Sequence, residues 1–250
     1  MLKGKVAVVT GAGTGIGAAI VRLFAQQGCR VVLAGRRREP LEAIAREVDG
    51  IAVSTDVRSE AQVVRLFQAC DRGFGRLDIL VNNAGTGGPT VPIEAEDMTA
   101  WDDTFAVNVR GVALCIKHAV PLLKRQGGAI VNIASDAVLR PKAQRAAYAA
   151  SKCAVVGLTQ VVAQELGPVN IRVNTVVPGA TRTEMLMEIF KARALQYGLS
   201  EEAVMQQAVQ GTALGRIAEP EDIAAAALFL AADASRAITG TVLVADAGRR

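Results

Sequence analysis

The sequence VAVVTGAGTGIG, from Val6 to Gly17, contains the strongest structural signal in the chain. Its first part is an apolar, β-branched run that predicts a strand buried on both faces of a sheet. The glycines predict a tight turn, and the apolar residues that follow, from Ala18 to Phe24, predict a helix. A helix that begins at such a turn presents free backbone N–H groups and a positive dipole end, which suit a pyrophosphate. A glycine turn with a purely structural role is the alternative.

The same alternation of strand and helix continues to the end of the chain. Strands are predicted at 30–34, 51–54, 77–81, 129–133, 171–177 and 241–245. Helices are predicted at 40–48, 60–73, 101–124, 146–166 and 220–231, with one or two amphipathic helices over 184–211. This pattern predicts an α/β fold, a doubly wound parallel sheet with helices on both faces. Ligands then bind beyond the carboxyl ends of the strands, so the residues after each strand are the candidates for function.

Length and composition favour one domain with a substantial core. The chain has 250 residues, of which 51% are hydrophobic and 24 are glycine, and no linker or repeat divides it. We therefore predict a single domain over 1–250, with a small helical lid at about 184–211. The net charge is +4, but the basic residues are scattered apart from Arg36-Arg37-Arg38, and aromatic residues are few. This distribution argues against a nucleic-acid partner.

The cysteines and the apolar segments indicate the compartment. Cys29, Cys70, Cys115 and Cys153 are widely spaced and form no CxxC pair, which favours reduced thiols in a cytoplasmic protein. Gly11 interrupts the apolar run near the N-terminus, so we expect no signal peptide. The apolar stretch 223–232 is too short to span a bilayer, so we also expect no membrane partner. His118 is the single histidine; its mid-helix position favours a structural role, and we expect no metal site.

The helix predicted over 146–166 carries small or apolar residues on nearly every face. A helix of this kind must be covered on both sides, and the sheet can cover only one of them. We therefore expect a homo-oligomer, a tetramer or a dimer.

Polar residues with a chemical use follow the fifth predicted strand. Ser135 comes directly after it, and the next helix contains Tyr148 and, four positions later, Lys152. Residues i and i+4 share one face of a helix, so the phenol and the ammonium can point into one cleft. A nearby ammonium favours the phenolate and lowers the pKa of the tyrosine, which gives a proton donor and acceptor for alcohol–carbonyl chemistry. An ordinary exposed pair is the alternative for Tyr148 and Lys152 taken alone.

With these neighbours, the chain resembles the short-chain dehydrogenase/reductase family, from Lys5 to about Gly248. The motifs that carry the resemblance are the TGxxxGxG turn at 10–17, the NNAG strand end at 82–85, Asn108, Ser135, Tyr148 with Lys152, and the PGxxxT segment at 178–183. The resemblance implies a sheet of seven parallel strands in the order 3-2-1-4-5-6-7. It also implies an oxidoreductase in which the nicotinamide transfers the hydride.

The resemblance implies four catalytic residues. Tyr148 would be the general acid in reduction and the base in oxidation. Lys152 would lower its pKa and hold the ribose of the nicotinamide, and Ser135 would orient the substrate oxygen. Asn108 would bind a water molecule that links Lys152 to solvent; an asparagine that merely distorts its helix is the alternative.

The resemblance also implies which residues bind the cofactor, with Asp56 and Val57 at the adenine. The implied residues are Gly11, Gly13, Thr14, Gly15, Ile16, Gly17, Gly35, Arg36, Arg37, Asp56, Val57, Asn83, Ala84, Gly85, Tyr148, Lys152, Pro178, Gly179, Thr181 and Thr183.

The end of the second strand favours NADP(H) over NAD(H). NAD-specific relatives carry an acid there, whereas this chain has Gly35 followed by Arg36 and Arg37. Arginine can bind a 2′-phosphate through charge-assisted hydrogen bonds. A solvated basic helix start is the alternative. The glycine turn differs from that of NADP-preferring relatives, which often carry a second basic residue where this chain has Thr14. This difference weakens the prediction of NADP(H).

The segments predicted to surround the substrate carry apolar and basic residues. The lid residues Met185, Leu186, Met187, Ile189, Phe190 and Leu195 are apolar; they would admit a hydrophobic ketone, or they simply pack the lid down. Arg140, Lys142 and Arg145 could attract an anionic substrate, but a solvated loop is the preferred interpretation.

Other functions on the same fold stay open. A 3-oxoacyl-carrier-protein reductase is possible, although Pro168-Val169-Asn170 replaces the basic residue that such enzymes often have before the sixth strand. A non-catalytic dinucleotide-binding regulator would typically have lost the tyrosine or the lysine. Dehalogenation or epimerisation is a third possibility.

Overall fold

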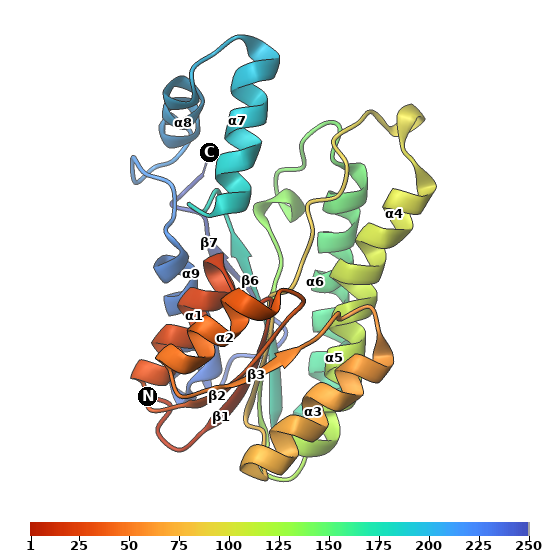
Figure 1. The fold of residues 1–250 in the computed structure, drawn as a ribbon, viewed down its shortest axis with the longest axis vertical. Helices are drawn as coiled ribbons and strands as arrows, with labels where there is room; N and C mark the ends of the chain where they lie inside the picture. The colour runs from red at the N-terminus through yellow and green to blue at the C-terminus, as the bar shows by residue number, and fades with distance from the viewer. Residues whose placement is uncertain (250) are drawn as a thin grey trace.

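The computed structural model describes residues 1–249 and confirms the predicted α/β fold (Figure 1). Seven strands form one sheet in the order β3-β2-β1-β4-β5-β6-β7, and every neighbouring pair is parallel. The strands are β1 Val6–Thr10, β2 Arg30–Gly35, β3 Ile51–Ser54, β4 Ile79–Asn82, β5 Gly128–Ile133, β6 Ile171–Pro178 and β7 Val242–Ala245. The order reverses between β1 and β4, which places the crevice expected for a ligand beyond the ends of these two strands.

Helices cover both faces of the sheet (Figure 1). They are α1 Gly15–Gln26, α2 Arg38–Glu47, α3 Glu60–Phe74, α4 Met98–Phe105, α5 Gly111–Leu123, α6 Ala146–Leu166, α7 Glu184–Tyr197, α8 Glu201–Gln210 and α9 Pro220–Ala231. Buried residues of α1, α2 and α9 form one hydrophobic core on the first face. Those of α3, α5 and α6 form a second core on the opposite face.

The opening strand β1 shows why both layers form. Its side chains alternate between the two faces, as the period of a strand requires. Ala7 and Val9 enter the core beneath α1, whereas Val6 and Val8 enter the other core. All four residues are completely buried. The apolar run at the N-terminus therefore holds the two layers together.

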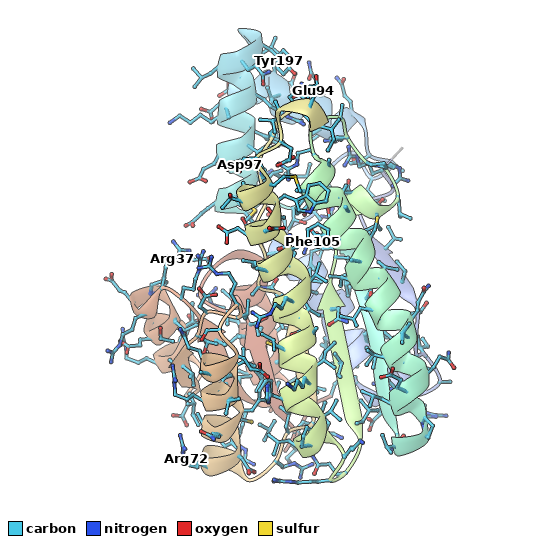
Figure 2. The ribbon with its side chains drawn as sticks, turned by 90° about the vertical axis from the view of Figure 1, so that its right-hand side faces the viewer. Arg37, Arg72, Glu94, Asp97, Phe105 and Tyr197 are labelled. Carbon is cyan, nitrogen blue, oxygen red and sulfur yellow. The ribbon has the colours of Figure 1, made fainter. Side chains whose placement is uncertain are left out.

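The helix predicted over 101–124 is one continuous helical stretch with an internal irregularity. It begins earlier than predicted, because the Asp97 side chain accepts a hydrogen bond from Thr99 N at 2.9 Å and caps α4 (Figure 2). Between α4 and α5, residues Ala106–Arg110 form a π-helical turn. Turns of this kind occur frequently at functional sites, and Asn108 lies in the middle of this one.

The lid consists of the two helices α7 and α8, which stand beyond the carboxyl ends of the strands (Figure 1). Gly198 ends α7 in the left-handed conformation with φ of 64°. Phe190, Ala194 and Val204 form a small hydrophobic cluster between the two helices, separate from the main cores. The lid therefore has its own packing.

Two helical stretches, Met98–Leu123 and Ala146–Val169, are long and apolar enough to cross a membrane by length and composition alone. The buried core helices of folded domains satisfy the same criteria. Both stretches contribute buried residues to the core shared by α5 and α6, including Cys115 and Val155.

The four cysteines are unpaired, as predicted, and Cys153 alone among them is exposed. Burial raises the pKa of Cys29, Cys70 and Cys115 to about 12, with smaller contributions from neighbouring charges at the first two. Thiols with such pKa values are protonated and chemically inert at neutral pH.

Candidate active site

The glycine turn leaves its backbone open to a ligand. Helix α1 begins at Gly15, and neither a side-chain cap nor an acidic residue occupies its first turn. Its first N–H groups are therefore available to an anion. A Cβ atom on Gly11 would lie 2.8 Å from Asn83 Nδ2, and one on Gly17 would lie 2.2 Å from Gly11 O. Only glycine fits at these two positions, and the cradle that results suits the pyrophosphate of a nicotinamide dinucleotide.

Thr10 and Asn83 join this turn to the end of β4. The Thr10 hydroxyl accepts hydrogen bonds from Asn83 N and Ala84 N, both at 3.0 Å. The Asn83 amide donates to Thr10 O at 3.0 Å and to Gly11 O at 3.1 Å. The side chain of Asn83 therefore shapes the cradle. The motif predicts Asn83 as a cofactor ligand; the structure adds Thr10, the first residue of the TGxxxGxG motif, as a residue that positions the turn.

The end of β2 presents cations beside the glycine turn. Arg36 and Arg37 are exposed, and Arg37 Nη2 donates a hydrogen bond to Thr14 Oγ1 at 3.2 Å (Figure 2). Among residues 1–249, neither arginine forms an ion pair with a carboxylate. By contrast, the next residue, Arg38, pairs with Glu42 at 2.6 Å.

Asp56 and Val57, the two residues predicted at the adenine, differ in which of their groups a ligand can reach. Arg58 binds the carboxylate of Asp56 at 2.7 Å and, with a smaller contribution from Arg36, lowers its pKa. Val57 is buried, with 7% of its surface exposed, and belongs to the core shared with α5. Val57 can therefore offer its backbone to a ligand, whereas its side chain fills the interior.

Tyr148 and Lys152 share one face of α6, as the spacing predicts. Lys152 Nζ lies 5.9 Å from the centroid of the Tyr148 ring and donates a hydrogen bond to Ile133 O at the end of β5, at 3.0 Å. The lysine is 6% exposed, and burial lowers its pKa to about 8. The i, i+4 relationship thus brings both groups to the end of β5.

The pKa of Tyr148 is shifted in the direction opposite to the one expected. Burial raises the pKa of the phenol, and this effect is opposed by a hydrogen bond with Ser135 and by the charge of Arg145. The Arg145 guanidinium carbon lies 4.6 Å from the centroid of the Tyr148 ring. The expectation that Lys152 lowers this pKa is not met, because desolvation dominates and the cation nearer to the ring is Arg145, at 4.6 Å from the centroid against 5.9 Å for Lys152.

Ser135 lies where β5 gives way to the next loop, and the C-terminal segment supports that loop. Ser135 Oγ donates to Asp136 Oδ1 at 3.3 Å and accepts from Ala137 N at 3.2 Å. Arg249 binds the carboxylate of Asp136, and Arg140 binds Asp246 at 3.0 Å. These two ion pairs could not be predicted from the sequence, because the paired residues are more than a hundred positions apart.

Asn108 is buried, and its side chain fixes the loop that follows β4. Its Oδ1 accepts from Thr86 N at 2.8 Å, and its Nδ2 donates to Thr86 O and to Ser151 Oγ, both at 3.0 Å. A Cβ atom on Gly85 would lie 3.3 Å from Asn108 Oδ1 and 3.4 Å from Lys152 Nζ. Asn108 thus both sits in a distorted helix and reaches the neighbourhood of Lys152. The water contact expected of it stays a prediction.

The segment 178–183 closes the crevice from the side of the lid. A Cβ atom on Gly179 would lie 2.7 Å from Asp246 Cα, and one on Gly15 would lie 3.2 Å from the Thr183 methyl group. Thr183 also caps α7, because its hydroxyl accepts from Leu186 N at 3.3 Å. Thr181 Oγ1 donates to Gly179 O at 3.1 Å. The start of the lid therefore lies directly beside the glycine turn.

Five of the six apolar lid residues divide into two groups, and the sixth, Met187, is half-buried. Phe190 is buried between α7 and α8, with Leu186 and Ile189 packed against it, which supports the packing interpretation for these three. Met185 and Leu195 are exposed, at 52% and 79%. Elsewhere, His118 Nε2 lies 2.9 Å from Glu60 Oε1 on α3, and residues 1–249 contain no His, Cys, Asp or Glu cluster that could hold a metal ion.

Known proteins resemble this chain in sequence and in fold. Residues 11–250 match a family model described as enoyl-(acyl carrier protein) reductase. A D-threitol dehydrogenase of Mycolicibacterium smegmatis is 40% identical, covering 99% of this chain and 93% of that protein. A 3-oxoacyl-acyl-carrier-protein reductase of Thermotoga maritima is 34% identical, covering 99% and 98%. The crystal structure of an NAD⁺-bound xylitol dehydrogenase superimposes with a TM-score of 0.92 at 33% identity, covering 99% of each chain.

Proposed function

Since this chain belongs to the short-chain dehydrogenase/reductase family and is an oxidoreductase acting on alcohol or ketone groups, we propose that it interconverts a secondary alcohol and a ketone with NADP(H). The observation that carries the proposal is the convergence of Ser135, Tyr148 and Lys152 at the end of β5. A nicotinamide cofactor, when bound, supplies or accepts the hydride.

The residues of the chain then have the following roles. Tyr148 donates its proton to the substrate oxygen in reduction and accepts it back in oxidation. Ser135 holds that oxygen by exchanging its bond with Asp136 for one with the substrate. Lys152 holds the ribose hydroxyls, and Asn108 fixes the loop at Thr86 and contacts the water beside Lys152. The glycine turn, Thr183 and the ends of β2, β3 and β4 hold the rest of the cofactor.

A preference for NADP(H) is the finer part of the proposal. A nicotinamide dinucleotide as such is common to the family, and the related xylitol dehydrogenase was solved with NAD⁺. In this chain, Arg36 and Arg37 are exposed without a carboxylate partner in residues 1–249, at the place where a 2′-phosphate would lie. Charge-assisted bonds to phosphate support the preference.

We expect Arg36→Gln and Arg37→Gln each to lower kcat/KM for NADPH by about 10-fold or more, the loss typical of one bond to a charged group. The kcat/KM for NADH should change little, because NADH carries no 2′-phosphate. Arg38→Gln is the matched control, since Arg38 already pairs with Glu42. Steady-state assays at 340 nm measure the effect. A wild-type kcat/KM for NADH equal to or above that for NADPH contradicts the preference.

We also propose a homo-oligomer, a tetramer or a dimer, built on the outer face of α6. Cys153, Gly157 and Val161 recur at helical spacing and are exposed, with Val161 at 58%. A Cβ atom on Gly157 would meet nothing within 4 Å. An apolar face of this kind on a monomer favours a protein partner.

Val161→Glu should therefore convert the oligomer to smaller species, because a buried carboxylate without a partner is strongly unfavourable at an interface. Size-exclusion chromatography with light scattering measures the mass. Leu195→Glu, at another exposed apolar position, should leave the mass unchanged. A monomeric wild type at micromolar concentration contradicts the proposal.

The second candidate function is a 3-oxoacyl-carrier-protein reductase, favoured by the family description and by the relative from Thermotoga maritima. A non-catalytic dinucleotide-binding regulator is disfavoured by the presence of both Tyr148 and Lys152. A panel of ketones, secondary alcohols and 3-oxoacyl thioesters, followed at 340 nm with each cofactor, separates these functions.

The proposal extends to the domain organisation, the location and the partner of the protein. Residues 1–250 act as a single nucleotide-binding domain whose lid lies at about 184–211, supported by the single sheet and by the separate packing of α7 and α8. A cytoplasmic location is supported by the four unpaired thiols, and a small molecule rather than a nucleic acid or a membrane is the expected partner.

A further inference from the structure

A guanidinium lies against the phenol of the proposed catalytic tyrosine. Arg145, directly before α6, places its guanidinium carbon 4.6 Å from the centroid of the Tyr148 ring. Its Nη1 donates to Thr90 Oγ1 at 3.1 Å, in the loop that follows β4. A Cβ atom on Gly87 of that loop would lie 3.5 Å from Arg145 Nη2. The arginine is half-buried between two segments that border the reacting group.

The charges of two further cations, Lys142 and Arg193, interact with that of this guanidinium. Lys142 belongs to the loop after β5, and Arg193 lies on the lid helix α7. Burial lowers the pKa of Lys142, and the charges of Arg193 and Arg145 lower it further. Burial also lowers the pKa of Arg145, where the charge of Arg193 adds to the effect and Tyr148 opposes it. Three positive charges, two from the loop after β5 and one from α7, therefore repel one another, and one of them, Arg145, lies against the ring of Tyr148.

These three cations differ from three arginines on the neighbouring loops and the C-terminal segment, each of which is paired with a carboxylate. Arg140 pairs with Asp246 at 3.0 Å, Arg182 pairs with Glu219 at 2.9 Å, and Arg249 pairs with Asp136. Within residues 1–249, no carboxylate forms an ion pair with Lys142, Arg145 or Arg193. Like charges without a carboxylate partner repel one another, and Arg145 and Arg193 are in addition half-buried. Binding of an anion would neutralise this repulsion and compensate the desolvation of the two arginines.

We propose that Lys142, Arg145 and Arg193 bind an anionic group of the substrate. This inference rests on the proposed alcohol–ketone chemistry and narrows its substrate class. Because Arg145 is stacked on the ring of Tyr148, the anionic group lies a few bonds from the reacting carbon. The substrate is thus a small ketone or secondary alcohol that carries a carboxylate or a phosphate, both of which suit the forked donors of arginine.

The test compares matched probes that differ only in charge. 4-Oxopentanoate and its methyl ester form the carboxylate pair, and dihydroxyacetone phosphate and dihydroxyacetone form the phosphate pair. Calorimetric titration of the protein, alone and with each oxidised cofactor, measures the Kd of every probe. At least one anionic probe should bind about 10-fold or more tightly than its neutral partner, and added salt should weaken that binding. The pair with the larger ratio identifies the anion.

Variants of Arg193 on the lid and of Lys142 in the loop after β5 show whether the three cations are responsible. Arg193→Gln and Lys142→Gln should each reduce the ratio of anionic to neutral affinity several-fold. Lys191→Gln removes an exposed charge from the same helix and should leave the ratio unchanged. The inference is overturned if each anionic probe binds no more tightly than its neutral partner. It is also overturned if Arg193→Gln leaves the ratio of anionic to neutral affinity unchanged.

The binding measurement separates this inference from the proposed reaction. Turnover of neutral ketones without any preference for anionic probes refutes the anion site and leaves the oxidoreductase function standing. Preferential binding of an anionic probe that Arg193→Gln abolishes supports the anion site even where that particular probe is not reduced.

Discussion

Tyr148→Phe should lower kcat by about 10²- to 10⁴-fold, the contribution that a positioned general acid or base makes. The substitution removes one hydroxyl and keeps the ring that packs against Arg145. Because burial raises the pKa of Tyr148, the phenol holds its proton at neutral pH and is ready to donate it in reduction. Oxidation requires the phenolate, so its rate should increase as the pH rises towards that pKa.

Two controls make the result on Tyr148 decisive. Tyr197→Phe changes the other tyrosine, which lies at the far end of the lid helix α7 and is 65% exposed (Figure 2); kcat should stay within twofold of the wild type, about the effect of a surface substitution. Calorimetric binding of the cofactor should be similar in wild type and Tyr148→Phe. Near-full turnover by Tyr148→Phe with intact cofactor binding removes the phenol from the mechanism.

Lys152→Met should abolish turnover and at the same time stabilise the fold. Burial lowers the pKa of Lys152 from 10.5 to about 8, so the unfolded chain binds this proton more tightly than the native protein does. The difference corresponds to about 3 kcal/mol of destabilisation at neutral pH. Methionine has a similar length and no charge, and the lost hydrogen bond to Ile133 O offsets about 1 kcal/mol. The net gain should be about 2 kcal/mol.

Chemical denaturation across a pH series measures this stability effect. Between pH 8 and pH 10.5 the unfolded state binds more protons at this site, so the site's contribution makes the free energy of unfolding of the wild type rise with pH. That contribution should be absent from Lys152→Met. Lys191→Met, at an exposed position, should retain the wild-type pH dependence. If Lys152→Met is less stable than the wild type at pH 7, the buried ammonium does not destabilise the native protein by the expected amount.

The order of the elements and the placement of the motifs were predictable because both are local properties of the chain. Hydrophobic period and glycine position identified β1 and α1, and the parallel sheet then brought all the strand ends to one edge. The spacing of Tyr148 and Lys152 predicted a shared helix face, and the structure bears this out. The π-helical turn at Ala106–Arg110 was not predictable, because its apolar pattern is that of an ordinary helix.

The electrostatics of the site depend on contacts between distant segments. The sequence by itself determined which residues follow each strand, since backbone propensity and side-chain period act over a few residues. Only the tertiary structure decided that Arg145 lies over Tyr148, that Arg249 supports the loop at Asp136, and that the pKa of Tyr148 rises instead of falling. Desolvation and charge pairing depend on everything packed around a group, and that environment exists only once the chain has folded.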